Sequence, residues 1–338
     1  MFVFFPDKIT QLCEKAGRDF YLVVPPAFQG KVSLERGMYA SANLVFAEDH
    51  QGFRTLIESF SANAHVLYIP NFDRNKSLLR EADLKPQQTI IKFGTATFPV
   101  NWSMVRSFLE VLCKTDVESQ IRLAEYFFEL IDKNNTISFQ DNNYGTAAYL
   151  EMVPPCQLNE LYGYAGDQQI QVSPTGEVAI SSDEPFSIFP KPLPLNGKIC
   201  LQSYPLVSSH GCEPFMQVKN QQRLHRCLVS LISNPVIVTF KNGKIIELAP
   251  AENTTDLSGL RVLSSLMEID QRYATLVEIG IGLNTQFKIR PVNCGLIEVY
   301  GHRNYCVHYG FGNASTDYHL DLISPNTKIV IGNKVLNT

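Results

Sequence analysis

The sequence lacks an excess of basic residues. Its 338 residues include 29 Lys and Arg against 33 Asp and Glu, which gives a formal net charge of -4. A protein that binds nucleic acid or an anionic membrane surface through a general electrostatic field needs the opposite balance. We therefore expect neither nucleic acid nor a membrane as a partner.

Long apolar runs and cysteine motifs are missing too. No run approaches the ~18 apolar residues of a membrane span, and Met1 to Phe5 lacks the basic start and the length of a signal peptide. The expected location is therefore the cytoplasm. No two of the eight cysteines are separated by two or three residues, which excludes zinc-ribbon, iron–sulfur and thioredoxin-type sites. His210 and Cys212 are neighbours in the sequence only, and this alone does not predict an activated nucleophile.

The length and the hydrophobic pattern indicate two domains. Single domains seldom exceed about 250 to 300 residues, and 45% of this chain is hydrophobic. Over residues 20–93 short apolar runs alternate with helical patterns, which is typical of βαβ units, and two amphipathic helices follow. Strands and tight turns dominate later. We predict an N-terminal α/β domain of residues 1–135 and a strand-rich C-terminal α+β, metal-binding domain of residues 136–338.

Two hairpins are expected in the second domain. Asn242-Gly243 joins two apolar runs and favours a tight two-residue turn. Residues 173–176, Ser-Pro-Thr-Gly, indicate another turn, after which Glu177 opens the returning strand.

Ionisable residues interrupt three apolar strand patterns in the last third of the chain. Glu278 lies in one, His308 in the next, and His319 and Asp321 in a third. An ionised carboxylate buried in a strand costs several kcal/mol unless it is paired or ligated. His319 and Asp321 share a face because strand side chains alternate. A mixed nitrogen and oxygen metal site would account for all four residues.

Simpler interpretations remain open at this point. His308 is alternatively a hydrogen-bonded core residue, and Asp321 alternatively only orients His319. Glu278 alternatively pairs with Arg272 or Arg290.

The motifs around these residues resemble those of the aminopeptidase T, or leucyl aminopeptidase-like, family of thermophilic metallo-aminopeptidases. The resemblance rests on their order and spacing: Pro174–Val178 (Pro-Thr-Gly-Glu-Val), Arg272–Asn284, Glu298, Val307–Asn313 and His319–Ile323. It covers residues 170–338.

The resemblance implies a hydrolase that removes the N-terminal residue of a peptide with two divalent ions, Zn, Mn or Co. The implied ligands are Glu177, Glu278, Glu298, His308, His319 and Asp321, with Glu278 shared between the ions. Glu177 or Glu298 would move the proton of the attacking water, and Tyr318 or Tyr309 would replace a tyrosine of the family. A peptide substrate and a homodimer follow by the same analogy.

Two other functions remain open. The same superfamily includes a ring-opening dioxygenase with a single Fe(II), for which His308, His319 and Asp321 would supply two histidines and one carboxylate. The connection between His308 and His319 is also shorter than the family has. This favours, as a third possibility, a non-catalytic peptide-binding protein that kept the fold.

Overall fold

The computed structural model describes residues 1–71, 80–94, 100–182, 190–209, 214–313 and 315–337. Helices and strands are mixed throughout, so the predicted combination of α/β and α+β architecture is confirmed. The chain divides into two compact units: unit 1 comprises residues 1–121 and 161–176, and unit 2 comprises residues 122–160 and 177–338. None of the described helices combines the length and the apolar character needed to cross a membrane.

The two units are interleaved along the chain, whereas the sequence predicts one boundary between residues 135 and 136. Helix α3 (Val117–Lys133) continues from unit 1 into unit 2, and β10 (Gln169–Val172) returns to unit 1 to pair with β6 (Thr89–Lys92). The predicted hairpin across residues 173–176 is wrong. Its second strand, β11 (Glu177–Ser182), pairs with β16 (Leu276–Gly282) in another sheet. The backbone hydrogen bonds of β10 and β11 are made with strands far away in the sequence, β6 and β16. The local turn sequence does not specify these partners.

Unit 1 is built on a parallel sheet. Its five strands lie in the order β10-β6-β5-β2-β4, and every pair is parallel. Such a sheet is covered on both faces, which fits the short and almost wholly apolar runs in the sequence. The remaining elements of unit 1 are β1 (Phe2–Phe4), β2 (Asp19–Val24), β3 (Val32–Leu34), β4 (Ser41–Phe46), α1 (His50–Ser59), β5 (Ala64–Tyr68) and α2 (Trp102–Lys114).

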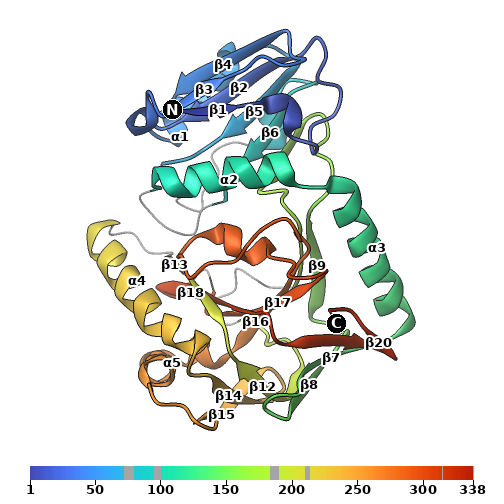
Figure 1. Ribbon diagram of the computed structural model, residues 1–338, viewed down its shortest axis with the longest axis vertical. Helices are drawn as coiled ribbons and strands as arrows, with labels where there is room; N and C mark the ends of the chain where they lie inside the picture. The colour runs from blue at the N-terminus through green and yellow to red at the C-terminus, as the bar shows by residue number, and fades with distance from the viewer. Residues whose placement is uncertain (72–79, 95–99, 183–189, 210–213, 314, 338) are drawn as a thin grey trace. The chain divides into compact units, whose positions relative to one another are not determined.

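Unit 2 contains two sheets. The first has the order β13-β18-β17-β16-β11-β9, and its further strands are β9 (Cys156–Leu161), β13 (Tyr204–Ser209), β17 (Cys306–Phe311) and β18 (Tyr318–Ser324). The second has the order β15-β14-β12-β8-β7-β19-β20: β7 (Thr136–Asp141), β8 (Thr146–Glu151), β12 (Leu195–Leu201), β14 (Val236–Lys241), β15 (Lys244–Pro250), β19 (Lys328–Ile331) and β20 (Lys334–Val335). Helices α4 (Pro214–Leu228) and α5 (Ser258–Ile269) and the second part of α3 also belong to the unit (Figure 1).

The predicted hairpin at Asn242-Gly243 is confirmed. Both turn residues have positive φ, 50° and 72°, and they join β14 to β15. Positive φ at both central residues matches the right-handed twist of the flanking strands, and Asn and Gly tolerate it best.

The two sheets of unit 2 pack through apolar faces. The ring of Phe139 in β7 meets Tyr309 in β17 at 5.8 Å, and Phe240 in β14 stacks on Phe311 in β17 at 6.3 Å. Because strand side chains alternate, His308, which precedes Tyr309 on β17, projects from the opposite face of the six-stranded sheet. That opposite face carries the ionisable residues that the sequence singles out.

Candidate metal centre

Five of the six predicted metal ligands project from one face of the six-stranded sheet. They come from four neighbouring strands: Glu177 in β11, Glu278 in β16, His308 in β17, and His319 and Asp321 in β18. The register explains the convergence: Gly280 pairs with Ala179 and His308, and Gly310 pairs with Glu278 and Asp321. Paired residues of an antiparallel sheet share a face, and so do residues two apart on one strand.

Two glycines make room for these side chains. A Cβ on Gly280 would overlap the His308 imidazole and lie 2.6 Å from Glu177 Oε1. A Cβ on Gly310 would lie 2.7 Å from the Cβ of Glu278 and 3.1 Å from the His319 ring. Each glycine therefore leaves the space in which a histidine and a glutamate side chain lie close together.

The first group of donors consists of Glu177, Glu278 and His308, with one donor atom from each lying within 4.8 Å of the other two. His308 Nε2 lies 3.3 Å from Glu177 Oε1, and the His308 side chain is 1% exposed. Neither ring nitrogen of His308 has a hydrogen-bond partner among the described residues. A buried imidazole without partners is costly, and this differs from the hydrogen-bonded core histidine of the simpler interpretation.

The second group consists of Glu278, His319 and Asp321 and meets the same 4.8 Å criterion. His319 Nε2 lies 2.8 Å from Asp321 Oδ1 and 3.7 Å from Glu278 Oε2. Its other nitrogen, Nδ1, lies 2.8 Å from the backbone oxygen of Gly312 and donates to it. Metal-binding histidines commonly donate one ring N–H to a carbonyl in this way, which turns the second nitrogen toward the ion.

Glu278 belongs to both groups, and among the described residues it forms an ion pair with His319 and none with an arginine. Arg272 forms a 2.5 Å ion pair with Asp270, and Arg290 is exposed. The interpretation in which Glu278 pairs with Arg272 is therefore wrong. The shared carboxylate agrees with the bridging role that the family resemblance implies.

Glu298 reaches the site from outside the sheet. It lies in a short 3-10 helix, η6 (Gly295–Val299), and its carboxyl group lies close to that of Asp321. Two buried carboxyl groups in such proximity need a shared proton or a cation between them. Glu298 is outside both three-residue groups, so the structure places it beside the candidate ligands.

Tyr318 and Tyr309 do not join the site. Each directly precedes or follows a histidine on its strand, so its side chain projects from the opposite face. Tyr309 packs against Phe139 in the core, and Tyr318 bonds Asn220 of α4. The structure therefore supports neither Tyr309 nor Tyr318 as the replacement for the family's tyrosine. The alternation of side chains along a strand already argued against both, because each is adjacent to a predicted ligand.

The carboxylates are held in a strongly perturbed environment. Burial and then the charges of Glu278 and Asp321 raise the pKa of Glu177 well above its usual value. Burial also raises the pKa of Glu278, to about 7, and that of Glu298 well above its usual range, where Asp321 adds to the effect. Repulsion among neighbouring carboxylates in a dry site would be relieved by bound cations.

The two histidines respond in opposite directions. Burial lowers the pKa of His308 to about 4, which keeps the ring neutral. Burial acts in the same sense on His319, but Asp321 and Glu278 outweigh it and raise the pKa of His319 to about 10. Burial alone would raise the pKa of the Asp321 carboxyl, but the adjacent His319 holds this pKa below its usual value.

The donor set fits divalent metal ions. It combines imidazole nitrogens with carboxylate oxygens, the mixture suited to Zn, Mn, Co or Fe(II). Two buried donors point into the site without a hydrogen-bond partner among the described residues: the ring of His308 and Asp321 Oδ2. The Gly312 carbonyl, which orients His319, is the functional group that sequence reasoning missed, because no side-chain pattern marks a backbone oxygen. His210 and Cys212 lie outside the described residues.

A family model described as "Crocagin biosynthetic protein CgnE/B" matches residues 41–331. This is a different family from the aminopeptidase T family that the sequence motifs resemble. No curated protein matches the chain.

Solved structures give two similarities over nearly the full length. The 2,5-dihydroxypyridine dioxygenase of Pseudomonas putida KT2440 has a TM-score of 0.52 and 13% identity, covering 94% of this chain and 89% of that one. Wild-type AmpT of Thermus thermophilus has a TM-score of 0.40 and 13% identity, covering 94% and 90%. At this identity the dioxygenase shares the fold, which says nothing of the reaction.

Proposed function

We propose that this chain, which belongs to the crocagin biosynthetic protein CgnE/B family, is a metal-dependent hydrolase that cleaves a peptide or peptide-like amide. The observation that carries the proposal is the pair of three-residue donor groups that share Glu278. Two ions bridged by one carboxylate are typical of centres that hydrolyse amides and esters.

Each end of the site has its own donors. His308 and Glu177 would hold one ion, His319 and Asp321 the other, and Glu278 both. The ions, when bound, would act as Lewis acids that favour ionisation of a water and polarise a carbonyl.

The chain's own residues supply the proton chemistry. Glu298 contacts Asp321, stands outside the two donor groups, and has a raised pKa. A carboxylate with a raised pKa accepts a proton from water and returns it to a leaving amine near neutral pH. We therefore propose proton transfer for Glu298 and metal ligation for Glu177, two roles between which the sequence left both residues open.

The single-iron dioxygenase is the second candidate. It would bring His308, His319 and Asp321 together on one ion, but the two histidines fall into different donor groups among the described residues. That division favours the two-ion hydrolase over the dioxygenase.

Metal analysis of protein purified without added ions tests the proposal. We expect two equivalents of Zn, Mn or Co, and Glu278→Gln to lose both because it removes the shared donor. Glu252→Gln, at an exposed position, is the matched control and should keep them. The rate at which new amino groups are released from peptides with a free N-terminus should be proportional to the metal content of each variant.

Other outcomes would replace the proposal. One equivalent of iron together with oxygen consumption on an aromatic diol would identify the dioxygenase. A metal-free protein that binds a peptide without cleaving it would identify the binding protein.

A further inference from the structure

The carbonyl that orients His319 belongs to the turn between β17 and β18, residues 312–317, of which Ala314 lies outside the described residues. Gly312 begins this turn with φ of 77°, and its oxygen accepts the hydrogen bond from His319 Nδ1. A Cβ at Gly312 would lie 2.5 Å from the Tyr318 oxygen and 2.8 Å from Thr316 Oγ1. The path of this turn therefore decides where the Gly312 carbonyl points.

The Thr316 hydroxyl makes hydrogen bonds to both ends of the turn. Its Oγ1 lies 2.7 Å from the backbone oxygens of both Asn313 and Tyr318, and it accepts a 3.0 Å hydrogen bond from the Asn313 amide. The residue is 3% exposed. One hydroxyl thus connects the two ends of the turn, next to Gly312 on one side and His319 on the other.

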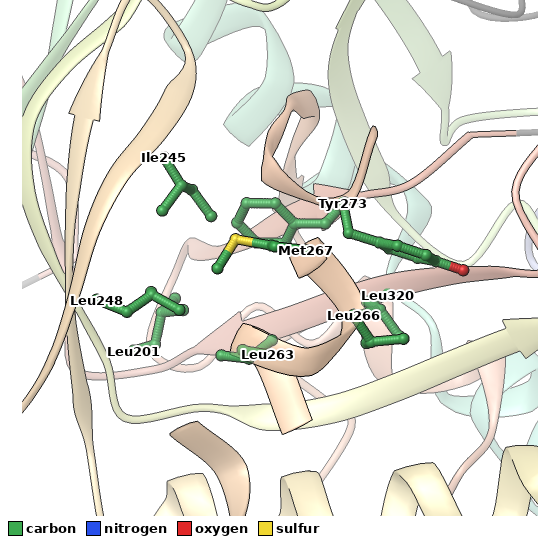
Figure 2. Close-up of a pocket in the computed structure, with 9 residues that line it drawn as sticks. Leu201, Ile245, Leu248, Leu263, Leu266, Met267, Tyr273 and Leu320 are labelled. Carbon is green, nitrogen blue, oxygen red and sulfur yellow. The ribbon is translucent and has the colours of Figure 1, made fainter. Parts of the chain in front are cut away.

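Tyr273 holds the same turn from the apolar side of the sheet. Its hydroxyl accepts a 3.0 Å hydrogen bond from the Tyr318 amide and is bonded to Thr316. The ring lies at an apolar pocket, and in Figure 2 its oxygen points away from the aliphatic side chains. The pocket is lined by Leu201, Ile245, Leu248, Leu263, Leu266, Met267, Tyr273, Phe311 and Leu320. Packing of α5 and β15 there thus fixes a hydroxyl next to the turn.

From these contacts we infer that Thr316 and Tyr273 are positioning residues for His319. They hold the turn so that the Gly312 carbonyl accepts the hydrogen bond from His319 Nδ1–H and Nε2 faces Glu278 and Asp321. Neither residue belongs to the two candidate donor groups. The inference rests on the proposed function for its consequence, metal binding, but the hydrogen bond it concerns exists in the metal-free protein.

Four variants test this inference. Thr316→Val keeps the shape of the side chain and removes its hydrogen bonds, and Thr316→Ser keeps the hydroxyl. Tyr273→Phe keeps the ring in the pocket and removes only the hydroxyl. Tyr149→Phe is the matched control, because Tyr149 is 48% exposed. Tyr273→Phe also serves as the test if Thr316→Val does not fold.

Two readouts are needed. The first is the zinc dissociation constant, measured by competition with a coloured chelator. The second is the NMR signal of the His319 Nδ1 proton in metal-free protein, which a merely structural role would leave in place. We expect Thr316→Val and Tyr273→Phe to weaken zinc binding about 10- to 100-fold, the range for groups that orient a metal ligand, and to lose the protected Nδ1 proton. Thr316→Ser and Tyr149→Phe should match the wild type.

The outcomes separate the two proposals. If wild-type protein binds no zinc, the proposed function fails, and the Nδ1 proton still decides the inference. If folded Thr316→Val and Tyr273→Phe keep both the proton signal and wild-type zinc affinity, the positioning role is overturned.

Discussion

His308 and His319 project from the same face of one sheet, yet their surroundings differ in every respect that matters to a metal ligand. His308 is enclosed, neutral and without a hydrogen-bond partner among the described residues, and its Nε2 lies 3.3 Å from Glu177 Oε1. His319 donates to a backbone carbonyl and pairs with Asp321. At the His308 end the ring is positioned by the space that Gly280 leaves, and at the His319 end the ring is positioned by hydrogen bonds. Each end should therefore fail in its own way.

The largest effect is expected from Gly280→Ala. The added methyl would overlap His308 and crowd Glu177, so the His308 end should lose its ion. Overpacking should lower the free energy of unfolding by about 1–3 kcal/mol. Metal analysis and thermal unfolding check this. Gly52→Ala, in α1 where a Cβ meets only ordinary contact, is the control. Full metal content in Gly280→Ala would break the comparison.

His308→Ala and His319→Ala should each remove one ion of the two. The ends share only Glu278, so each variant keeps the donors of the other end. Titration with zinc, followed by mass spectrometry under native conditions, counts the ions. If either variant lost both ions, the two ends would have to be described as a single site.

Of the two histidines, only His319 should release a proton upon metal binding. The pKa of His319 is about 10 and that of His308 about 4, so at pH 7.5 the His319 ring must give up a proton to become a ligand, whereas the His308 ring is already neutral. Zinc affinity at the His319 end should therefore rise with pH between about 6.5 and 9. NMR of the two imidazole rings at pH 7.5 should show that zinc removes a proton from His319 and none from His308. Loss of a proton from both rings would contradict the assignment.

The stability of metal-free protein should depend on pH with opposite signs at the two ends. Because the folded pKa of His308 is lowered, its contribution is complete above pH 6.5 and is lost as the pH falls toward 4. The folded pKa of His319 is raised, so its contribution is complete below pH 6.5 and is lost as the pH rises toward 10. Each change should be on the order of a few kcal/mol. Urea unfolding across pH 4–10 should show the acid limb flattened in His308→Asn and the alkaline limb in His319→Asn.

Tyr318→Phe should have the smallest effect. Its side chain lies on the face opposite His319 and bonds Asn220, so metal content should not change. The free energy of unfolding should fall by about 1 kcal/mol at most, from the lost hydrogen bond. If this variant lost metal or amide cleavage, Tyr318 would have to be counted among the residues of the site.

Much of the site could be predicted because strands leave a local signature. His319 and Asp321 are two apart, Glu278 interrupts an apolar strand, and Gly280 lies two residues beyond it on the same face; a period of two is sufficient to align these residues. The same period argued against Tyr309 and Tyr318. Glu298 followed only from a family resemblance, because a 3-10 helix of five residues has no such period.

The sequence by itself determined the residue types, their order and the face from which each projects, since side-chain alternation is a property of a single strand. Only the tertiary structure decided which strands lie side by side. It paired β10 with β6 rather than with β11, and it set Gly280 and Gly310 opposite the side chains that need their space. Pairing depends on hydrogen bonds and packing between segments far apart in the chain, and no local pattern specifies those partners.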